Sequence, residues 1–308
     1  MVRYIVKRLS AGLMTIFILI TVTFFLMHAV PGGPFSPAEE KNVPPEVLAR
    51  IASMYGLDKP VGEQYILYIK NLLHGDLGVS YKKTGTGVNE LVERGFPVSA
   101  RVGAWAIALA LIIGVGLGVL SAIWRGSPVD VFSLILATVG ISIPMFVISL
   151  LLLRVFAGML KWLPSYGLTS WRHYILPVAC LSFNPVAYIA RQTRSSMLEV
   201  MEQDYIRSAR AKGLPELVVI VKHGLKNAVM PVVTYLGPLV AGLLTGSFVV
   251  ERLFSIPGIG RDFVTSITDR DYTVIMGITI FFGAFVVISN LVVDILYAVI
   301  DPKVRITE

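Results

Sequence analysis

The chain has 308 residues, of which 55% are hydrophobic and only 15% are charged, and its formal net charge is +7. Soluble domains carry about 25% charged residues, so this composition, with a mean hydropathy of +0.73, excludes an ordinary soluble protein and indicates a membrane protein. The basic residues are dispersed among apolar segments, which argues against nucleic-acid binding. The single cysteine, Cys180, excludes a disulfide within the chain.

Six apolar windows approach the roughly 20 residues that are needed to cross about 30 Å of hydrocarbon. They cover residues 9–30, 102–124, 131–157, 174–190, 229–250 and 274–300. The fourth window is the shortest and contains Pro177, Asn184 and Pro185, which lipid tolerates only where protein groups or water satisfy the freed backbone atoms. The sequence therefore predicts an all-α integral membrane protein with six transmembrane helices.

The distribution of lysine and arginine predicts the orientation. The first window follows Arg3, Lys7 and Arg8, is longer than the apolar run of a usual signal peptide and precedes no Ala-x-Ala site, so we expect an uncleaved anchor helix. With the N-terminus in the cytoplasm, the inner segments hold 13 lysines and arginines, whereas the two short outer loops hold five. The positive-inside rule then places both termini in the cytoplasm.

This topology divides the chain into three predicted segments. They are an N-terminal anchor helix (1–30), an extracytoplasmic segment (31–98) and a core of five transmembrane helices (99–308) that includes a cytoplasmic loop (191–228). In the extracytoplasmic segment, one apolar stripe follows Pro44 and Pro45 and ends at Gly56, and a second covers residues 61–73 and ends at Gly75. We expect two short amphipathic helices, which either pack on the first span or contact a substrate-delivering protein.

The cytoplasmic loop has the pattern of a capped helix, because residues 204–215 read DYIRSARAKGLP. Asp204 suits the N-cap of a helix over residues 205–212, Gly213 suits a left-handed C-cap, and Pro215 prevents continuation. A further helix is expected to start near Glu216 and to lead into the fifth span. We interpret the loop as a knob that docks into a groove of another protein. The alternative is a plain solvated loop with the positive charge of an inner segment.

The loop resembles the cytoplasmic EAA loop of ATP-binding-cassette (ABC) importer permeases, within the oligopeptide, dipeptide and nickel branch. Further matches cover the chain almost from end to end: 4–9 (YIVKRL), 55–60 (YGLDKP), 75–78 (GDLG), 222–231 (KHGLKNAVMP), 246–251 (GSFVVE), 256–260 (IPGIG), 270–272 (RDY) and 294–302 (DILYAVIDP). Four details look most like the B-type oligopeptide permease subunits: 31–35 (PGGPF), 96–100 (FPVSA), 234–238 (TYLGP) and 266–273 (SITDRDYT).

The loop departs from the general superfamily pattern at two places. Arg207 stands where that pattern has its glutamate, and residues 223–226 read HGLK where it has Ile-x-Leu-Pro. The peptide branch resembles this chain at both places. We therefore do not expect the contact with an ATPase to be centred on a glutamate of this loop. Its basic residues are expected to contact acidic or carbonyl groups of the ATPase. The resemblance implies seven ATPase-coupling residues: Asp204, Tyr205, Arg207, Ala209, Arg210, Lys212 and Gly213.

The resemblance also implies a type I importer permease in a bacterial cytoplasmic membrane. Its partners would be a homologous second permease subunit, most simply in a heterodimer, two ATPase subunits and an extracytoplasmic solute-binding protein. The chain lacks a GxxxxGK[ST] loop, so ATP and Mg²⁺ would be bound by the ATPase subunits. Oligopeptides are the expected substrate, with dipeptides or nickel as alternatives. A secondary transporter is the competing class, but it has no need of a short helix between spans four and five.

Polar or kinking residues inside the predicted spans indicate a translocation path. Such residues are costly against lipid and are expected to face the bundle interior, although packing between helices is the alternative for each. The candidates are Ser142, Pro144, Asn184, Tyr188, Tyr235 and Thr245. Asp294 is the only acidic residue within a window, and we expect it to serve either as a proton or ion site or as a hydrogen-bonded structural carboxylate. The four histidines lack ligand spacing and no catalytic constellation appears, so we expect neither a metal site nor catalysis by this chain alone.

Overall fold

The computed structural model describes residues 2–29, 53, 56–83 and 85–300. Within this part of the chain every element is helical, apart from one isolated bridge between Val79 and Gly87. The elements are α1 (Val2–Ala29), α4 (Val61–Leu73), α5 (Val88–Ile123), α6 (Pro128–Ser142), α7 (Met145–Leu152), the π-helix η1 (Leu153–Met159), α8 (Arg172–Met201), α9 (Asp204–Ala211), α10 (Glu216–Val218), the π-helix η2 (Val219–Leu225), α11 (Lys226–Ala228), α12 (Met230–Leu244), α13 (Phe248–Leu253), α14 (Ile259–Asp269) and α15 (Tyr272–Ile300).

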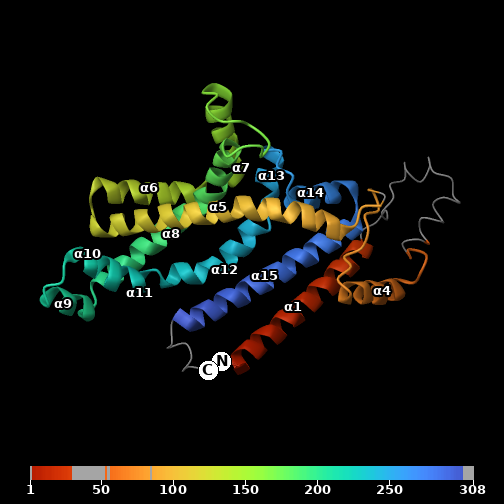
Figure 1. Ribbon diagram of the computed structural model, residues 1–308, viewed down its shortest axis with the longest axis horizontal. Coiled ribbons are helices and arrows are strands. Elements are labelled where there is room, and N and C mark those ends of the chain that lie inside the picture. The colour runs from red at the N-terminus through yellow and green to blue at the C-terminus, as the bar shows by residue number, and fades with distance from the viewer. Residues whose placement is uncertain (1, 30–52, 54–55, 84, 301–308) are drawn as a thin grey trace.

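The long helices form a bundle with two different ends (Figure 1). We call the end that carries α9 and α10 the elbow end, and the opposite end, with α4, α14 and the start of α5, the cap end. Five described helices are long and apolar enough to cross a membrane, or six if α6 and the bent α7–η1 segment count as one span. Helices α1 and α15 pack antiparallel, because Gly12 lies against Val287 and Gly283 against Leu19.

Helices α5 and α8 form the centre of the bundle and approach closely over small residues. Buried alanines and glycines recur every four residues along α5: Ala106, Ala110, Gly114, Gly118 and Ala122. A Cβ at Gly114 would lie 2.8 Å from the Cβ of Ile189, and one at Gly118 would lie 2.6 Å from the Cβ of Thr193. Membrane helices associate largely through such small-residue faces, because lipid supplies no hydrophobic drive to pack them.

Two exposed tryptophans, one on α5 and one directly after it, indicate where the membrane interfaces lie. Trp105 is 61% exposed and Trp124 is 51% exposed. They are separated along the helix by about 29 Å, close to the thickness of the hydrocarbon, and tryptophan favours both interfaces. Nearly half of α5, the part before Trp105, therefore extends beyond the membrane at the cap end. There it packs through Val88, Leu91 and Val92 against α14 and α15.

The window over residues 131–157 is not one continuous helix. It is divided between α6 and α7–η1, whose axes differ by 108°. Ile143, which precedes Pro144, takes the extended backbone conformation that a following proline favours, with φ −86° and ψ 125°. The third window is therefore a sharply bent pair of helices with its break at Pro144, which was expected as a kinking residue, and in Figure 1 α7 projects away from the bundle.

Other sequence predictions have mixed outcomes. The helix expected over residues 61–73 is confirmed as α4, with Gly75 in a positive-φ conformation directly beyond it. The fourth window lies within α8, which is a continuous helix of 30 residues despite Pro177 and Pro185. The fifth window is interrupted after Leu244, where the chain turns at Gly246 into α13. The short helix expected before Gly56 lies outside the described residues. The predicted boundary between residues 98 and 99 lies inside α5.

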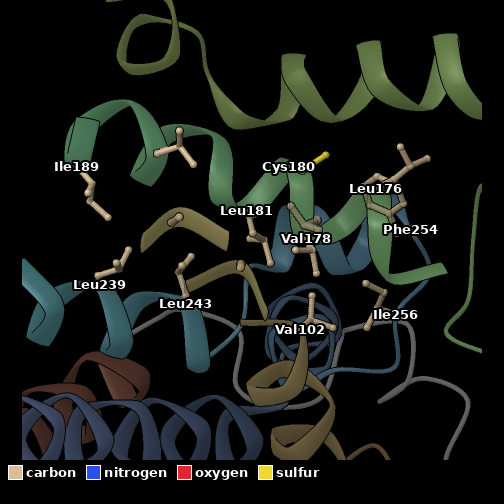
Figure 2. Packing of buried hydrophobic residues seen from close by; sticks show 14 of the residues in the cluster. Val102, Leu176, Val178, Cys180, Leu181, Ile189, Leu239, Leu243, Phe254 and Ile256 are labelled. Atoms are coloured by element: carbon tan, nitrogen blue, oxygen red, sulfur yellow. The ribbon is translucent and has the colours of Figure 1, made fainter. Parts of the chain in front are cut away.

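The main apolar cluster lies where α5, α8, α12 and α13 meet. Figure 2 shows Val178 and Leu181 of α8 pointing toward Val102 of α5 and Leu243 of α12. Phe254 and Ile256, just beyond α13, are 1% and 0% exposed and close the cluster at the cap end. Two of these helices, α8 and α12, also line the cavity described next, so the core holds these two walls in place.

Candidate translocation groove and coupling elbow

A cavity of about 540 Å³ opens between the α6–α7 break, α8 and α12. We call it the groove. Its lining residues are Ile141, Ser142, Ile143, Pro144, Met145, Leu181, Asn184, Pro185, Tyr235, Pro238, Leu239, Gly242 and Leu243. None of them is charged, so the groove offers apolar surface and a few neutral hydrogen-bonding groups.

The polar groups of the groove are partly engaged with its walls. Asn184 Nδ2 donates to the carbonyl oxygen of Gly140 at 3.2 Å, which attaches α8 to α6. Ser142 Oγ donates to the carbonyl oxygen of Thr138 at 2.8 Å, so its hydroxyl remains close to its own helix. The ring of Tyr235 lies against that of Tyr188, with centroids 4.2 Å apart. The wall therefore combines an amide, a hydroxyl and an aromatic pair.

The structure brings together most of the residues expected on the translocation path. Ser142, Pro144, Asn184 and Tyr235 line the groove. Tyr188 is 39% exposed and touches the groove only through Tyr235. Thr245 is not a lining residue: it is buried, and its Oγ1 donates to the carbonyl oxygen of Ala241 at 2.7 Å.

The cytoplasmic-loop helix forms as α9, with one difference in its capping. Gln203 is the N-cap and Asp204 is the first helical residue, with no side-chain cap bond, so the expected N-cap at Asp204 is wrong. Asp204 still lies in the first turn, where a carboxylate interacts favourably with the helix dipole. Gly213 has φ +76°, the left-handed conformation expected of it, and the next helical turn starts at Glu216.

We call residues 202–228, which follow α8 and precede α12, the elbow. Its apolar side faces inward: Ile206 is 0% and Ala209 is 7% exposed, and both pack with Val219 and Met201. Ala209, which was expected to couple to an ATPase, thus lies on the inward side of α9 and packs it onto the rest of the elbow. The remaining candidates on α9 face outward, and Tyr205 is 42% exposed and accepts a hydrogen bond from Asn227 Nδ2 at 2.8 Å.

Two of the three basic candidates in the elbow already have partners within the chain. The guanidinium of Arg210 binds both carboxylate oxygens of Glu216, at 3.2 and 2.7 Å. This hydrogen bonding lowers the pKa of Glu216 below its usual value and raises that of Arg210. Arg207 lies 3.6 Å from Asp204. Lys212 is exposed and has no ion pair among the described residues.

Sequence reasoning missed three buried carboxylates that organise the ends of the spans. They are Asp130, Glu251 and Asp271, which are 2%, 4% and 3% exposed. Asp130 lies at the elbow end, where both guanidinium bonds from Arg194 reach it at 2.6 and 2.8 Å. The pattern Ser-Pro-x-Asp over residues 127–130 is a helix-start signal that marks this position, but it does not reveal the arginine 64 residues away.

The other two carboxylates hold loops at the cap end. Glu251 accepts hydrogen bonds from Ser99 Oγ at 2.6 Å and from the amide of Arg261 at 2.9 Å. The same Ser99 Oγ accepts from the amide of Ile259 at 3.0 Å. Asp271 accepts from Ser80 Oγ and from the amide of Tyr81, and so fixes the loop before α5 to the start of α15.

Comparison with known proteins agrees with this architecture. The profile of the family described as "Binding-protein-dependent transport system inner membrane component" matches residues 114–306, and the profile for the N-terminal part of such components matches residues 1–100. The Dipeptide transport system permease protein DppB of Bacillus subtilis (strain 168) is 48% identical over 306 residues, which cover 99% of both chains. The Oligopeptide transport system permease protein OppB of Escherichia coli (strain K12) is 45% identical over 307 residues, 99% of this chain and 100% of that protein.

A solved structure shows a similar fold. The crystal structure of an amino acid ABC transporter with histidines aligns with a TM-score of 0.50 at 17% identity, over 70% of this chain and 94% of that chain. At this identity the likeness concerns the fold alone. The two family matches and the full-length relatives decide membership: this chain belongs to the inner-membrane permease components of binding-protein-dependent transport systems, in the branch of the oligopeptide and dipeptide permeases.

Proposed function

We propose that this chain is one of two homologous permease subunits of an ATP-driven peptide importer and forms half of its translocation pathway. The observation that carries the proposal is the similarity over 99% of the chain to dipeptide and oligopeptide permease proteins. The subunit itself supplies no catalytic group. It works with an extracytoplasmic binding protein, a second permease subunit and two ATPase subunits, which bind the ATP and Mg²⁺.

The groove is the wall that this subunit contributes to the pathway. Peptides carry side chains of either charge, and a wall of apolar and neutral polar groups neither traps nor repels one sign of charge. Asn184 and Tyr235 offer hydrogen-bonding groups to a peptide backbone. A groove with this chemistry suits passage better than tight binding.

The elbow receives the mechanical input. In our orientation, which rests on the positive-inside rule, the elbow and both termini are cytoplasmic and the cap end faces the binding protein. ATP-driven closure of the ATPase subunits moves α9, and with it the helices that line the groove. Because coupling is reciprocal, ATP and the loaded binding protein must both favour the same outward-open state.

Oligopeptides are the substrate we favour, as the sequence details indicated. Dipeptides and nickel are alternatives within the same branch, and a relative of each peptide class is nearly equally similar, at 45% and 48% identity. The test is reconstitution of the complete complex in liposomes. ATP-dependent uptake is then measured for labelled peptides of two to six residues and for Ni²⁺.

We expect uptake that requires both ATP and the binding protein, with oligopeptides preferred over dipeptides. Preference for dipeptides or Ni²⁺ would reassign the substrate within the branch. Uptake by this chain alone in liposomes without ATP would instead identify a secondary transporter and overturn the proposal.

A further inference from the structure

Two polar contacts, which we call the inner and the outer fastening, attach α6 to α8. The inner fastening is the one nearer the elbow, and it is a buried ion pair. Arg194 Nε lies 2.6 Å from Asp130 Oδ1, and its terminal nitrogen lies 2.8 Å from Oδ2. The side chain of Asp130 is 3% exposed and that of Arg194 is 19% exposed. The amide of Gly126 and the hydroxyl of Ser121 also donate to the carboxylate, so α5 takes part as well.

The outer fastening lies beside the groove. Asn184 Nδ2 donates to the carbonyl oxygen of Gly140. Gly140 also packs closely on α8, because a Cβ there would lie 2.5 Å from the Cβ of Ala187. The two fastenings are ten residues apart on α6, or about 15 Å along its axis. Two fixed points at this spacing prevent α6 from rotating or sliding on α8.

The helix that carries both fastenings leads directly into the elbow. Only Glu202 and Gln203 separate α8 from α9, and their amides bond to the carbonyl oxygens of Glu199 and Val200 at the end of α8. A displacement of α9 is therefore delivered to α8. The far end of α6, at Ile141 and Ser142, lines the groove. A continuous physical path thus runs from the elbow to the groove.

Stability alone is a weak reason for a buried ion pair in this place. Desolvation offsets most of the attraction between two buried charges, and apolar residues of the same size often stabilise as well. What a bidentate pair adds is fixed geometry, because the guanidinium fork accepts a carboxylate in one register. That property is useful where one helix must follow another without slipping.

We infer that Asp130 and Arg194 are positioning residues that carry the movement of the elbow from α8 to the α6 wall of the groove, with Asn184 as the second point of attachment. The inference rests on the proposed function, since it assigns a route to the coupling between ATP hydrolysis and transport. It places the linkage in the pair of helices α6 and α8, moving as one unit.

The test compares complexes that carry Asp130→Asn or Asn184→Ala with the unmutated complex, all complete and reconstituted in liposomes. The quantity measured is the number of peptides taken up per ATP hydrolysed. We expect this ratio to fall on the order of threefold to thirtyfold while ATPase activity persists, as is usual for residues that carry coupling. The matched control is Arg125→Gln, which breaks the neighbouring exposed pair of Arg125 and Glu202 and should leave the ratio unchanged.

An unchanged ratio in assembled Asp130→Asn would overturn the inference, and so would a proportional loss of uptake and ATPase activity, which marks a merely structural role. If Asp130→Asn does not assemble, the same two criteria are applied to Asn184→Ala. Absence of peptide uptake in the unmutated complex would contradict the proposed function instead, so the two failures are distinguishable.

Discussion

The two ends of the bundle are both held by buried carboxylates, but the donors differ. At the cap end, Glu251 accepts from the hydroxyl of Ser99 on α5 and from the amide of Arg261 in the first turn of α14, and both of these donors are neutral. At the elbow end, Asp130 accepts from the guanidinium of Arg194 on another long helix. The cap-end bonds fix loops to a scaffold, whereas the elbow-end bond joins two helices that can move together.

Exposure follows the same division. At the cap end, Ile256 in the loop after α13 and Ile259 at the start of α14 are fully buried. At the elbow end the pairs of Arg210 with Glu216 and of Arg207 with Asp204 are largely exposed. Exposed pairs contribute little to stability, so the elbow surface is available for rearrangement against a partner. The cap end is thus built to hold its shape and the elbow end to be moved.

The largest effect is expected from Arg194→Ala, which leaves the buried carboxylate of Asp130 without its counter-charge. Breaking a buried pair on one side costs about 3–5 kcal/mol, so the purified complex should unfold at a clearly lower temperature. Arg125→Ala removes an exposed arginine from the same end and is the control. Equal melting temperatures for the two variants would remove the contrast between buried and exposed pairs.

A smaller loss is expected from Glu251→Gln at the cap end. The variant keeps the size of the side chain, but its amide group replaces one of the two acceptor oxygens, and about 1–3 kcal/mol should be lost because a buried donor is left unsatisfied. Hydrogen exchange at the amides of Ile259 and Arg261 measures this locally. Glu90→Gln, at an exposed glutamate of α5, should leave both amides as protected as before.

At the elbow, Gly213→Val should reduce coupled transport while membrane insertion persists. No atom lies within 4 Å of the position of a Cβ at Gly213, so space is not limiting. The obstacle is the backbone: a left-handed conformation costs roughly 1–2 kcal/mol for residues with a Cβ, and more for a β-branched one. Gly213→Asn tolerates this conformation and should retain coupling. Normal peptide-stimulated ATPase activity in Gly213→Val would contradict a role for this turn.

The smallest effect concerns the exposed pair of Arg210 and Glu216. Because the pKa of Glu216 is lowered in the folded protein, its contribution to elbow stability is present above the ordinary carboxyl value of 4.5 and is lost as the pH falls through the lowered value. Hydrogen exchange of the elbow amides should therefore accelerate on acidification, and Glu216→Gln should abolish that difference. High salt should weaken the effect, as for any exposed pair.

Local sequence signals predicted the elements that local interactions determine. The helix α4 begins after Pro60, which suits a helix start, and Gly75 follows its end. Gly213 takes the left-handed conformation that its place in the DYIRSARAKGLP segment indicated. The break of the third window at Pro144 was also visible in the sequence, but hydropathy alone does not separate a broken span from a straight one.

The candidate site was only partly accessible from the sequence. Polarity inside apolar windows indicated Asn184 and Tyr235, which line the groove, but did not separate them from Thr245, whose hydroxyl is satisfied by its own helix. Asp130 and Glu251 were missed because each lies at the edge of a window, where a charged residue is ordinary. Their burial depends on partners distant in the chain.

The sequence by itself determined that this protein is a helical membrane protein, which segments are apolar enough to cross the bilayer, and where the elbow helix begins and ends to within a residue or so. These properties follow from hydropathy, helix capping and backbone preference, all of which act over a few residues. Only the tertiary structure decided which polar groups meet: Ser99 and Glu251 are 152 residues apart, and Asp130 and Arg194 are 64 apart. Such pairs form because a buried polar group without a partner is costly, and the packing of distant helices decides which partner is within reach.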